Sequence, residues 1–345
     1  MPVKLSVAYL PAIRNSASPY RLLDDSGQEV DWANRFLDAK RLLGRSPRSL
    51  RAYAFDLLHF ARWTADHWPP PLTDLTEAAL EQYVRHQLDR QPPPAAPTIN
   101  RRLGLVRALY RFHFESDIPG SERFPRTYFT RSPLGYGRPG RAVSYGLRLT
   151  EPRRIVMPLS TDDVARFWRS FRHYRDLALI GLMLLAGLRS CEVLALQFAD
   201  LRMAEAQILV CGKGNKPRLL PLPQDILEVL RQYLSLERPP TNSTSLFVCL
   251  KGRSRGLPLT SAGLRSLFRH HRATSHIPLA NPHRFRHTFG ADMVRAGISL
   301  PALQHLMGHA QIRTTLLYVQ LAPQDIWREY RSAVEKRAPL GGAPQ

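Results

Sequence analysis

The chain has 345 residues, which is too long for one ordinary hydrophobic core and fits two domains. Its 49 Lys and Arg against 28 Asp and Glu give a net charge of +21, which favours a nucleic-acid partner over a solubilising charge excess or a membrane surface. It has no run of 18 apolar residues, a poor signal-peptide pattern and three widely spaced cysteines without a CxxC pair. We therefore expect a cytoplasmic protein with reduced, mostly buried thiols and no membrane segment.

Residues 28–118 predict a helical domain, preceded by an extension over 1–27. Ser46-Pro47 is typical of a helix start, and apolar residues follow it at helical spacing. Thr76-Glu77 opens a second helix, and a third follows the proline-rich break at 91–97. An earlier helix, over about 29–43, would complete a cluster of four. A plain helical bundle with a solvated basic face fits this region equally well.

The character changes in residues 119–157, which predict an Arg-rich linker. Between 122 and 154 there are eight arginines against two acids, with several Gly and Pro, and this composition suits an extended segment rather than a core. Arginines here could lie along a phosphate backbone, although a flexible, solvated tether is an equal alternative. The candidate DNA contacts in the third helix and the linker are Arg101, Arg102, Arg126, Arg131, Arg138 and Arg141.

A second domain is predicted over 158–335, before a polar tail at 336–345. Ser160 to Asp163 is a helix-start pattern, and the long apolar stretch 175–196 predicts a buried helix. Residues 207–223 predict two short strands joined by a turn at 212–215. Further helices are expected at 224–237, 260–272, about 284–296, 299–308 and 311–317.

Four segments of this second domain together carry a family resemblance. They are AGLRSCEVLAL, the strand turn with Lys213, NPHRFRHTFGADMVRAG and LMGHAQIRTTLLYV, in that order, with nine residues from His309 to Tyr318. They resemble the successive motifs of the tyrosine recombinases of the phage-integrase type. The resemblance covers most of 155–335 strongly and 28–118 only in outline. Each motif alone is weak, but the ordered set is specific.

The chemistry of DNA cleavage explains why these residue types are needed. Breaking a phosphodiester requires a nucleophile, a proton donor for the leaving 5′-oxygen and positive charge around the phosphorane. Two guanidinium groups suit the last task because they grip phosphate oxygens bidentately and stay charged. By resemblance, Arg189 and Arg286 are these two arginines, and no metal or other cofactor is expected.

The resemblance also assigns the remaining roles. Tyr318 would attack phosphorus and hold the DNA 3′-end, although a phenol with a pKa of about 10 needs help from a base or from nearby cations. His283 would be the general base and Lys213 the general acid, with Lys216 as an alternative to Lys213. His309 would hydrogen-bond a non-bridging phosphate oxygen, and Glu192 would orient the active-site groups. The covalent link conserves the phosphodiester energy, so rejoining needs no ATP.

Less specific interpretations exist for the same residues. A lone tyrosine near a helix end is usually an amphipathic core residue, and Tyr233 and Tyr330 are expected to be of that kind. The pairs His283/His287 and His305/His309 have the i, i+4 spacing of a zinc site. No HExxH motif, cysteine pair or obvious carboxylate ligand accompanies them, so the sequence predicts no metal.

The resemblance implies a mainly α fold with a small antiparallel sheet in the catalytic domain and two domains that form a C-shaped clamp on DNA. Its expected partners are duplex DNA with inverted half-sites, a second protomer on each site, four protomers in the synapse, and accessory DNA-bending proteins. Strands would be exchanged through a Holliday junction in the bacterial cytoplasm, most plausibly for a mobile genetic element. The segment after Tyr318 would dock on a neighbouring protomer. The alternatives are a type IB topoisomerase and a non-catalytic DNA-binding regulator with the same fold.

Overall fold

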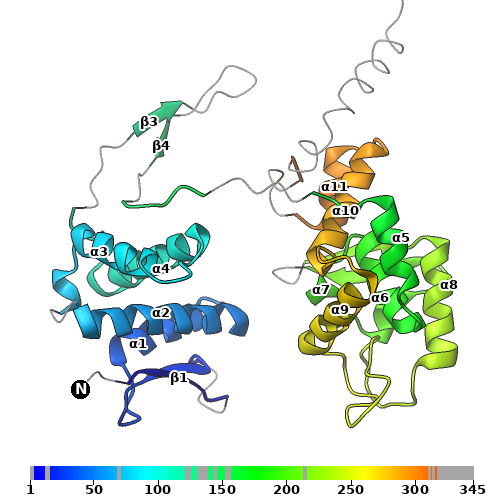
Figure 1. Ribbon diagram of the computed structural model, residues 1–345, viewed down its shortest axis with the longest axis horizontal. Helices are drawn as coiled ribbons and strands as arrows, with labels where there is room; N and C mark the ends of the chain where they lie inside the picture. Colours follow the sequence, from blue (N-terminus) through cyan, green and yellow to red (C-terminus); the bar gives the residue numbers. More distant parts are fainter. Residues whose placement is uncertain are drawn as a thin grey trace, which may run out of the picture. The chain divides into compact units, whose positions relative to one another are not determined.

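A computed structural model describes residues 4–11, 16–67, 71–120, 126–129, 139–142, 146–151, 157–212, 216–309, 312 and 315–316. The chain divides into two compact units, Met1–Arg153 and Arg154–Gln345. The described residues are mainly helical with small antiparallel sheets, as the sequence predicts (Figure 1). No helix among the described residues is long and apolar enough to cross a membrane.

The described residues of the first unit form four α-helices, and they match the four predicted from the sequence. They are α1 (Asp31–Leu42), α2 (Pro47–His67), α3 (Glu77–Leu88) and α4 (Ala96–Phe114), with a 3-10 helix at Leu72–Asp74. The predicted helix starts are correct: the Thr76 hydroxyl accepts from the N–H of Ala79, and Ser46 accepts from the N–H of Ser49. The helices enclose a core that includes the fully buried Phe36, Phe60 and Tyr83.

Two short hairpins in the first unit are absent from the sequence prediction. Strands β1 (Ser6–Tyr9) and β2 (Tyr20–Leu23) pair antiparallel, and buried Leu22 joins the helical core. Strands β3 (Arg126–Phe129) and β4 (Pro139–Ala142) pair antiparallel within the segment predicted as a linker. The Arg- and Gly-rich composition of that segment, without apolar alternation, gave no sign of the two strands.

The second unit begins with α5 (Thr161–Arg169), capped by Ser160 as predicted, and α6 (Tyr174–Leu185). After α7 (Ser190–Ala195) and a 3-10 helix at Phe198–Asp200 comes a three-stranded antiparallel sheet of β5 (Leu201–Arg202), β6 (Gln207–Cys211) and β7 (Pro217–Pro221). The chain continues through α8 (Gln224–Gln232), a π-helical turn at Tyr233–Glu237, α9 (Ser261–Ser275), α10 (Pro282–Arg295) and α11 (Leu300–Met307).

Among its described residues, the second unit has a large and a small hydrophobic cluster, and Leu306 packs against both. The larger surrounds α6, which packs against α8 and α10, and includes Phe167, Leu182 and Phe285. A small cluster of Phe289, Val294, Leu303 and Met307 joins α10 to α11. Helix α11 is therefore held by its own small core as well as by polar contacts.

Two expectations for this unit are wrong. The apolar stretch 175–196 is not one helix: α6 ends at Leu185, and the chain turns through Gly187 before α7 begins at Ser190. Apolar composition gave no sign of this break, because the turn residues are themselves buried. The cysteines are free but not mostly buried, since Cys191 and Cys211 are exposed.

Candidate active site

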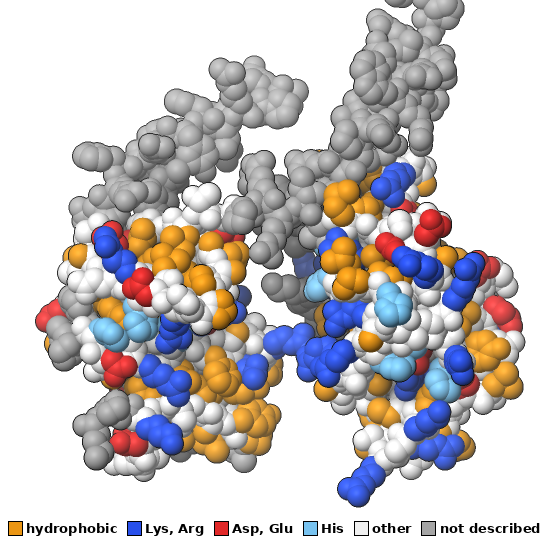
Figure 2. All heavy atoms as spheres, viewed as in Figure 1, with side chains coloured by type: hydrophobic (Ala, Val, Ile, Leu, Met, Phe, Trp, Pro, Cys, Tyr) orange, Lys and Arg blue, Asp and Glu red, His pale blue; other side chains and the backbone are white. Residues whose placement is uncertain are grey.

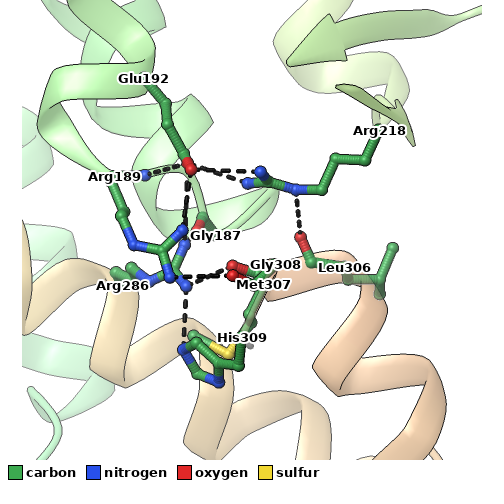
Figure 3. Close-up of polar contacts among 9 residues, drawn as sticks. All are labelled: Gly187, Arg189, Glu192, Arg218, Arg286, Leu306, Met307, Gly308 and His309. Atoms are coloured by element: carbon green, nitrogen blue, oxygen red, sulfur yellow. Dashed lines mark hydrogen bonds and ion pairs between the residues drawn. The ribbon is translucent and has the colours of Figure 1, made fainter. Parts of the chain in front are cut away.

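A buried carboxylate at the start of α7 organises the candidate site (Figure 3). Glu192 is 5% exposed, and its Oε2 accepts from the backbone N–H of Arg189 at 2.9 Å, which caps the helix. Its Oε1 accepts from Nη1 of the Arg189 side chain at 2.8 Å. One carboxylate thus fixes both the backbone and the guanidinium of Arg189.

A second arginine meets the same carboxylate from the sheet. Arg218 on β7 donates from Nη1 and Nη2 to the two oxygens of Glu192, at 3.1 and 2.9 Å. A third, Arg286 on α10, has Nη1 3.9 Å from Oε2. Among the described residues, the cluster therefore has three guanidinium groups around one carboxylate.

The arginines also bind the end of α11. Three successive carbonyls accept from three different guanidinium groups: Leu306 from Arg218 at 3.0 Å, Met307 from Arg286 at 2.5 Å and Gly308 from Arg189 at 3.1 Å. Cations are favourable at a helix C-terminus, where the last carbonyls lack intrahelical partners. Segments that lie far apart in the sequence meet at these carbonyls (Figure 3).

His309 follows α11 directly and is 8% exposed. Arg286 Nη2 lies 3.0 Å from Nε2 of His309, and because arginine can only donate, Nε2 must accept. The ring is then neutral with its proton on Nδ1, which donates to the hydroxyl of buried Thr315 at 3.0 Å. Thr315 is three residues before Tyr318, so His309 ties the arginine cluster to the segment that leads to this tyrosine.

Gly187 forms the turn between α6 and α7, and the positions of Arg189 and Arg286 depend on this turn. Its φ of +66° is a left-handed conformation, and a Cβ at this position would lie 2.4 Å from the Phe289 ring. The carbonyl of Gly187 accepts from Nη1 of Arg286. A glycine thus lets the chain turn towards Arg189 while its own carbonyl holds Arg286.

The charges of the cluster shift two pKa values in the same direction. Burial raises the pKa of Glu192, but the hydrogen bonds from Arg218 and from the backbone of Arg189 outweigh it, so the pKa is lowered and the carboxylate stays ionised. Burial, followed by the positive charges of Arg286 and Arg189, lowers the pKa of His309 from 6.5 to about 4. His309 is therefore neutral at pH 7, in agreement with its hydrogen bonds.

This lowered pKa predicts a pH-dependent stability. The unfolded chain protonates His309 near pH 6.5 and the folded chain only near pH 4, so its stabilising contribution is complete above pH 6.5 and is lost as the pH falls towards 4. We expect His309→Gln to flatten the fall in unfolding free energy over this range, measured by urea unfolding at several pH values. His305→Gln, at an exposed position on α11, is the matched control. Equal slopes for wild type and His309→Gln would contradict the assignment.

The structure brings together four of the predicted site residues: Arg189, Glu192, Arg286 and His309. His283 lies on α10 one turn before Arg286 and is exposed, with no contact to the cluster among the bonds described above. Lys213 and Tyr318 lie outside the described residues, whereas the alternative Lys216 is exposed at the start of the second strand of the hairpin. Within the described part of the chain, no three His, Cys, Asp or Glu residues are grouped to hold a metal.

The predicted DNA-binding arginines differ in their surroundings. Arg101 is 53% exposed and donates to Asp56 at 2.8 Å, whereas Arg102 is 17% exposed and donates to Gln87 at 2.7 Å. Arg126 lies on β3 and Arg141 on the paired strand β4. Arg131 and Arg138 lie outside the described residues. Lys and Arg side chains are spread over the visible face of each unit (Figure 2).

Sequence reasoning missed two residues of this site, Arg218 and Thr315. The signal for Arg218 was present: side chains alternate along β7, so Arg218 shares the buried face with Leu220 while Leu219 points outward. A charged residue on the buried face of a strand requires a partner. Thr315 carried no such signal, because nothing local distinguishes it from Thr314.

The chain is similar in sequence to known proteins. The model of the "Phage integrase family" matches residues 159–325, and that of the "Phage integrase, N-terminal SAM-like domain" matches 35–115. The chain is 28% identical to tyrosine recombinase XerC of Chlorobaculum parvum over 80% of this chain and 85% of that protein. It is 23% identical to tyrosine recombinase XerD of Staphylococcus epidermidis over 83% of this chain and 92% of that protein.

Solved structures show the same fold. The Tn1549 transposon integrase in complex with transposon right-end DNA matches with a TM-score of 0.62 at 18% identity, over 85% of this chain and 98% of that one. XerH recombinase bound to its difH substrate matches with a TM-score of 0.61 at 19% identity, over 88% of this chain and 85% of that one.

Proposed function

Since this chain belongs to the tyrosine recombinase family and is a site-specific DNA recombinase, we propose that it cleaves and rejoins DNA through a covalent 3′-phosphotyrosine at Tyr318. The observation that carries the proposal is the cluster of Arg189, Arg286 and His309 around Glu192. It gathers cationic and hydrogen-bonding groups at the point from which the chain leads to Tyr318. Such a cluster suits the charge of a phosphorane.

In the proposed reaction, the Tyr318 oxygen attacks phosphorus and the bond from phosphorus to the 5′-oxygen breaks. His283 takes the phenol proton, and Lys213 gives a proton to the leaving oxygen. Arg189 and Arg286 hold the non-bridging oxygens, and His309 donates to one of them. Because Nε2 of His309 accepts from Arg286 in the structure, that donation requires the proton to move from Nδ1 to Nε2 when phosphate binds. Rejoining reverses these steps with a 5′-hydroxyl as the nucleophile.

The proposal is tested with a DNA duplex that contains a site the protein binds and a nick beside the cleavage position. Protein and duplex are incubated together in EDTA. The nick lets the short product diffuse away, so the covalent adduct accumulates. We expect protein attached to a DNA 3′-end on a denaturing gel. A protein that binds the site and forms no adduct would instead be a DNA-binding regulator. An adduct without recombination between two sites would indicate topoisomerase chemistry.

The assignment of the general acid to Lys213 predicts a rescue. Lys213→Ala is expected to slow cleavage of ordinary DNA strongly, because the alkoxide leaving group needs a proton. A substrate with sulfur in place of the bridging 5′-oxygen should restore the rate, since a thiol, with a pKa of about 8.5, leaves without that help. Lys216→Ala is the matched control and should cleave both substrates like wild type. If the sulfur substrate instead restored cleavage by Lys216→Ala, the general acid would be Lys216 and not Lys213.

We also propose that residues 28–118 bind DNA, that 158–335 form the catalytic domain, and that 119–157 link them. Two protomers would occupy inverted half-sites, four would form the synapse, and accessory proteins would bend the DNA. Strand exchange through a Holliday junction would serve a mobile genetic element. The net charge of +21 supports the DNA-binding part of this proposal.

The two neighbouring arginines of α4 are expected to respond differently. Arg101→Ala should weaken DNA binding and lower the salt slope of the binding constant by about 1, because its guanidinium is half exposed. It should also cost some stability, because buried Asp56 then keeps only Arg102, at 3.6 Å, of these two arginines. Arg102→Ala should mainly destabilise the first unit, because it removes the partner of Gln87 from a largely buried site. Binding isotherms at several salt concentrations and urea unfolding separate the two effects. The same salt slope for wild type and Arg101→Ala would exclude the phosphate contact.

A further inference from the structure

Arg218 is a buried arginine to which no role in the reaction has been given above. We propose that it is a positioning residue: it fixes Glu192, and through Glu192 the guanidinium of Arg189, relative to Gly212 and the end of α11. The inference rests on the proposed function. Arg218 lies on the inward face of β7, and its side chain is 6% exposed.

The three guanidinium nitrogens of Arg218 all have protein acceptors. Nη1 and Nη2 take one oxygen each of Glu192, and Nε donates to the carbonyl of Leu306 at 3.0 Å (Figure 3). This bidentate fork is a geometry that arginine provides and lysine does not. Since both of its Nη atoms bind Glu192 and its Nε binds Leu306, we assign Arg218 an effect on the reaction through these neighbours.

Two glycines fit closely around this side chain. A Cβ on Gly212 would lie 3.2 Å from Nη1 of Arg218, and a Cβ on Gly308 would lie 2.9 Å from the same atom. Gly212 also closes the hairpin, with its N–H donating to the carbonyl of Lys216 at 2.9 Å. These glycines directly precede Lys213 and His309 in the sequence. The position of Arg218 is thus linked to the backbone on which two proposed catalytic residues follow.

Arg218 affects Arg189 because both guanidinium groups bind the same carboxylate, that of Glu192. Because Arg218 takes both carboxylate oxygens, Arg189 donates to Glu192 through Nη1 while its Nη2 bonds the carbonyl of Gly308. The Arg189 side chain remains 28% exposed and can meet a phosphate. Without Arg218, the carboxylate could turn to pair bidentately with Arg189 and draw it inward. Cleavage should then suffer more than DNA binding.

The test compares Arg218→Met and Arg218→Lys with Arg175→Met in the full chain. Arg175 is a matched control, because it also pairs with a buried carboxylate, Asp176 at 2.6 Å, and with a backbone carbonyl, that of Val248. On the nicked substrate, both Arg218 variants should form adduct about 10- to 100-fold more slowly, the usual effect of losing an orienting partner, at an unchanged DNA dissociation constant. Arg175→Met should lose stability but keep its cleavage rate. If Arg218→Met does not fold, the comparison with Arg175→Met can still be made with Arg218→Lys.

A second measurement separates positioning from general destabilisation. If Arg218 acts through Glu192, the double variant Arg218→Met/Glu192→Gln should cleave no more slowly than Glu192→Gln alone. Losses that multiply, or Arg218 variants that cleave as fast as Arg175→Met, would overturn the inference. A wild-type chain that forms no adduct on DNA it binds would overturn the proposed function itself, before any variant is compared.

Discussion

Tyr318→Phe is expected to bind its DNA site with wild-type affinity and to form no covalent adduct at all. The substitution removes only the phenolic oxygen that would attack phosphorus, so the loss should be complete rather than partial. The measurement is the EDTA assay on the nicked duplex, read on a denaturing gel. The ordered motifs and the nine-residue step from His309 to Tyr318 support this choice of nucleophile.

Tyr330→Phe is the matched control, because it makes the same chemical change twelve residues further along the chain. It should form adduct at the wild-type rate. An adduct that survives in Tyr318→Phe but disappears in Tyr330→Phe would move the nucleophile to the later tyrosine. The arginine cluster would then need to be reached from a segment beyond Tyr318.

Glu192→Gln is expected to have the largest effect on stability. The substitution keeps the shape of the side chain but leaves Arg189, Arg218 and Arg286 together without their carboxylate. Removing one partner of a buried ion pair costs about 3–5 kcal/mol, because the remaining charge stays buried without compensation. Hydrogen exchange of the α6 amides in increasing urea would measure the unfolding free energy of the second unit.

Glu228→Gln provides the comparison for that measurement. Glu228 pairs with Arg231 on the surface of α8, where both side chains are about half exposed. Solvent screens exposed ion pairs, so this variant should lose little stability. If the two variants lose the same stability, the cluster around Glu192 does not depend on its charge.

The sequence predicted more of the chemistry than of the geometry. Arg189, Glu192, Arg286 and His309 were found from the order of their motifs, and the structure places them together. It did not show that the guanidinium groups of Arg189 and Arg286 bind the last carbonyls of α11, because these are contacts between separate elements, 119 and 21 residues apart in the sequence. The pattern of apolar residues in 175–196 likewise could not show a turn whose residues are buried.

The N-terminal hairpin and the role of Arg218 were missed for different reasons. Strands β1 and β2 are four residues each, and most of their stabilisation comes from helices that the local sequence does not contain. Arg218 was visible in the alternation along its strand, but a strand pattern is usually searched for its apolar residues. A charged residue at a strand position that faces the core is more informative than the apolar residues beside it.

The end of α11 has a consequence for how DNA and protein compete. Its last carbonyls accept from Arg189 and Arg286, the two guanidinium groups proposed to hold phosphate, and its apolar support is the small cluster with Phe289 together with Leu306 against the large core around α6. A helix with so few apolar contacts opens locally at a lower free energy than the core does. The α11 carbonyls and a phosphodiester would thus be ligands of the same two guanidinium groups, so bound DNA would have to share or displace the bonds that cap this helix.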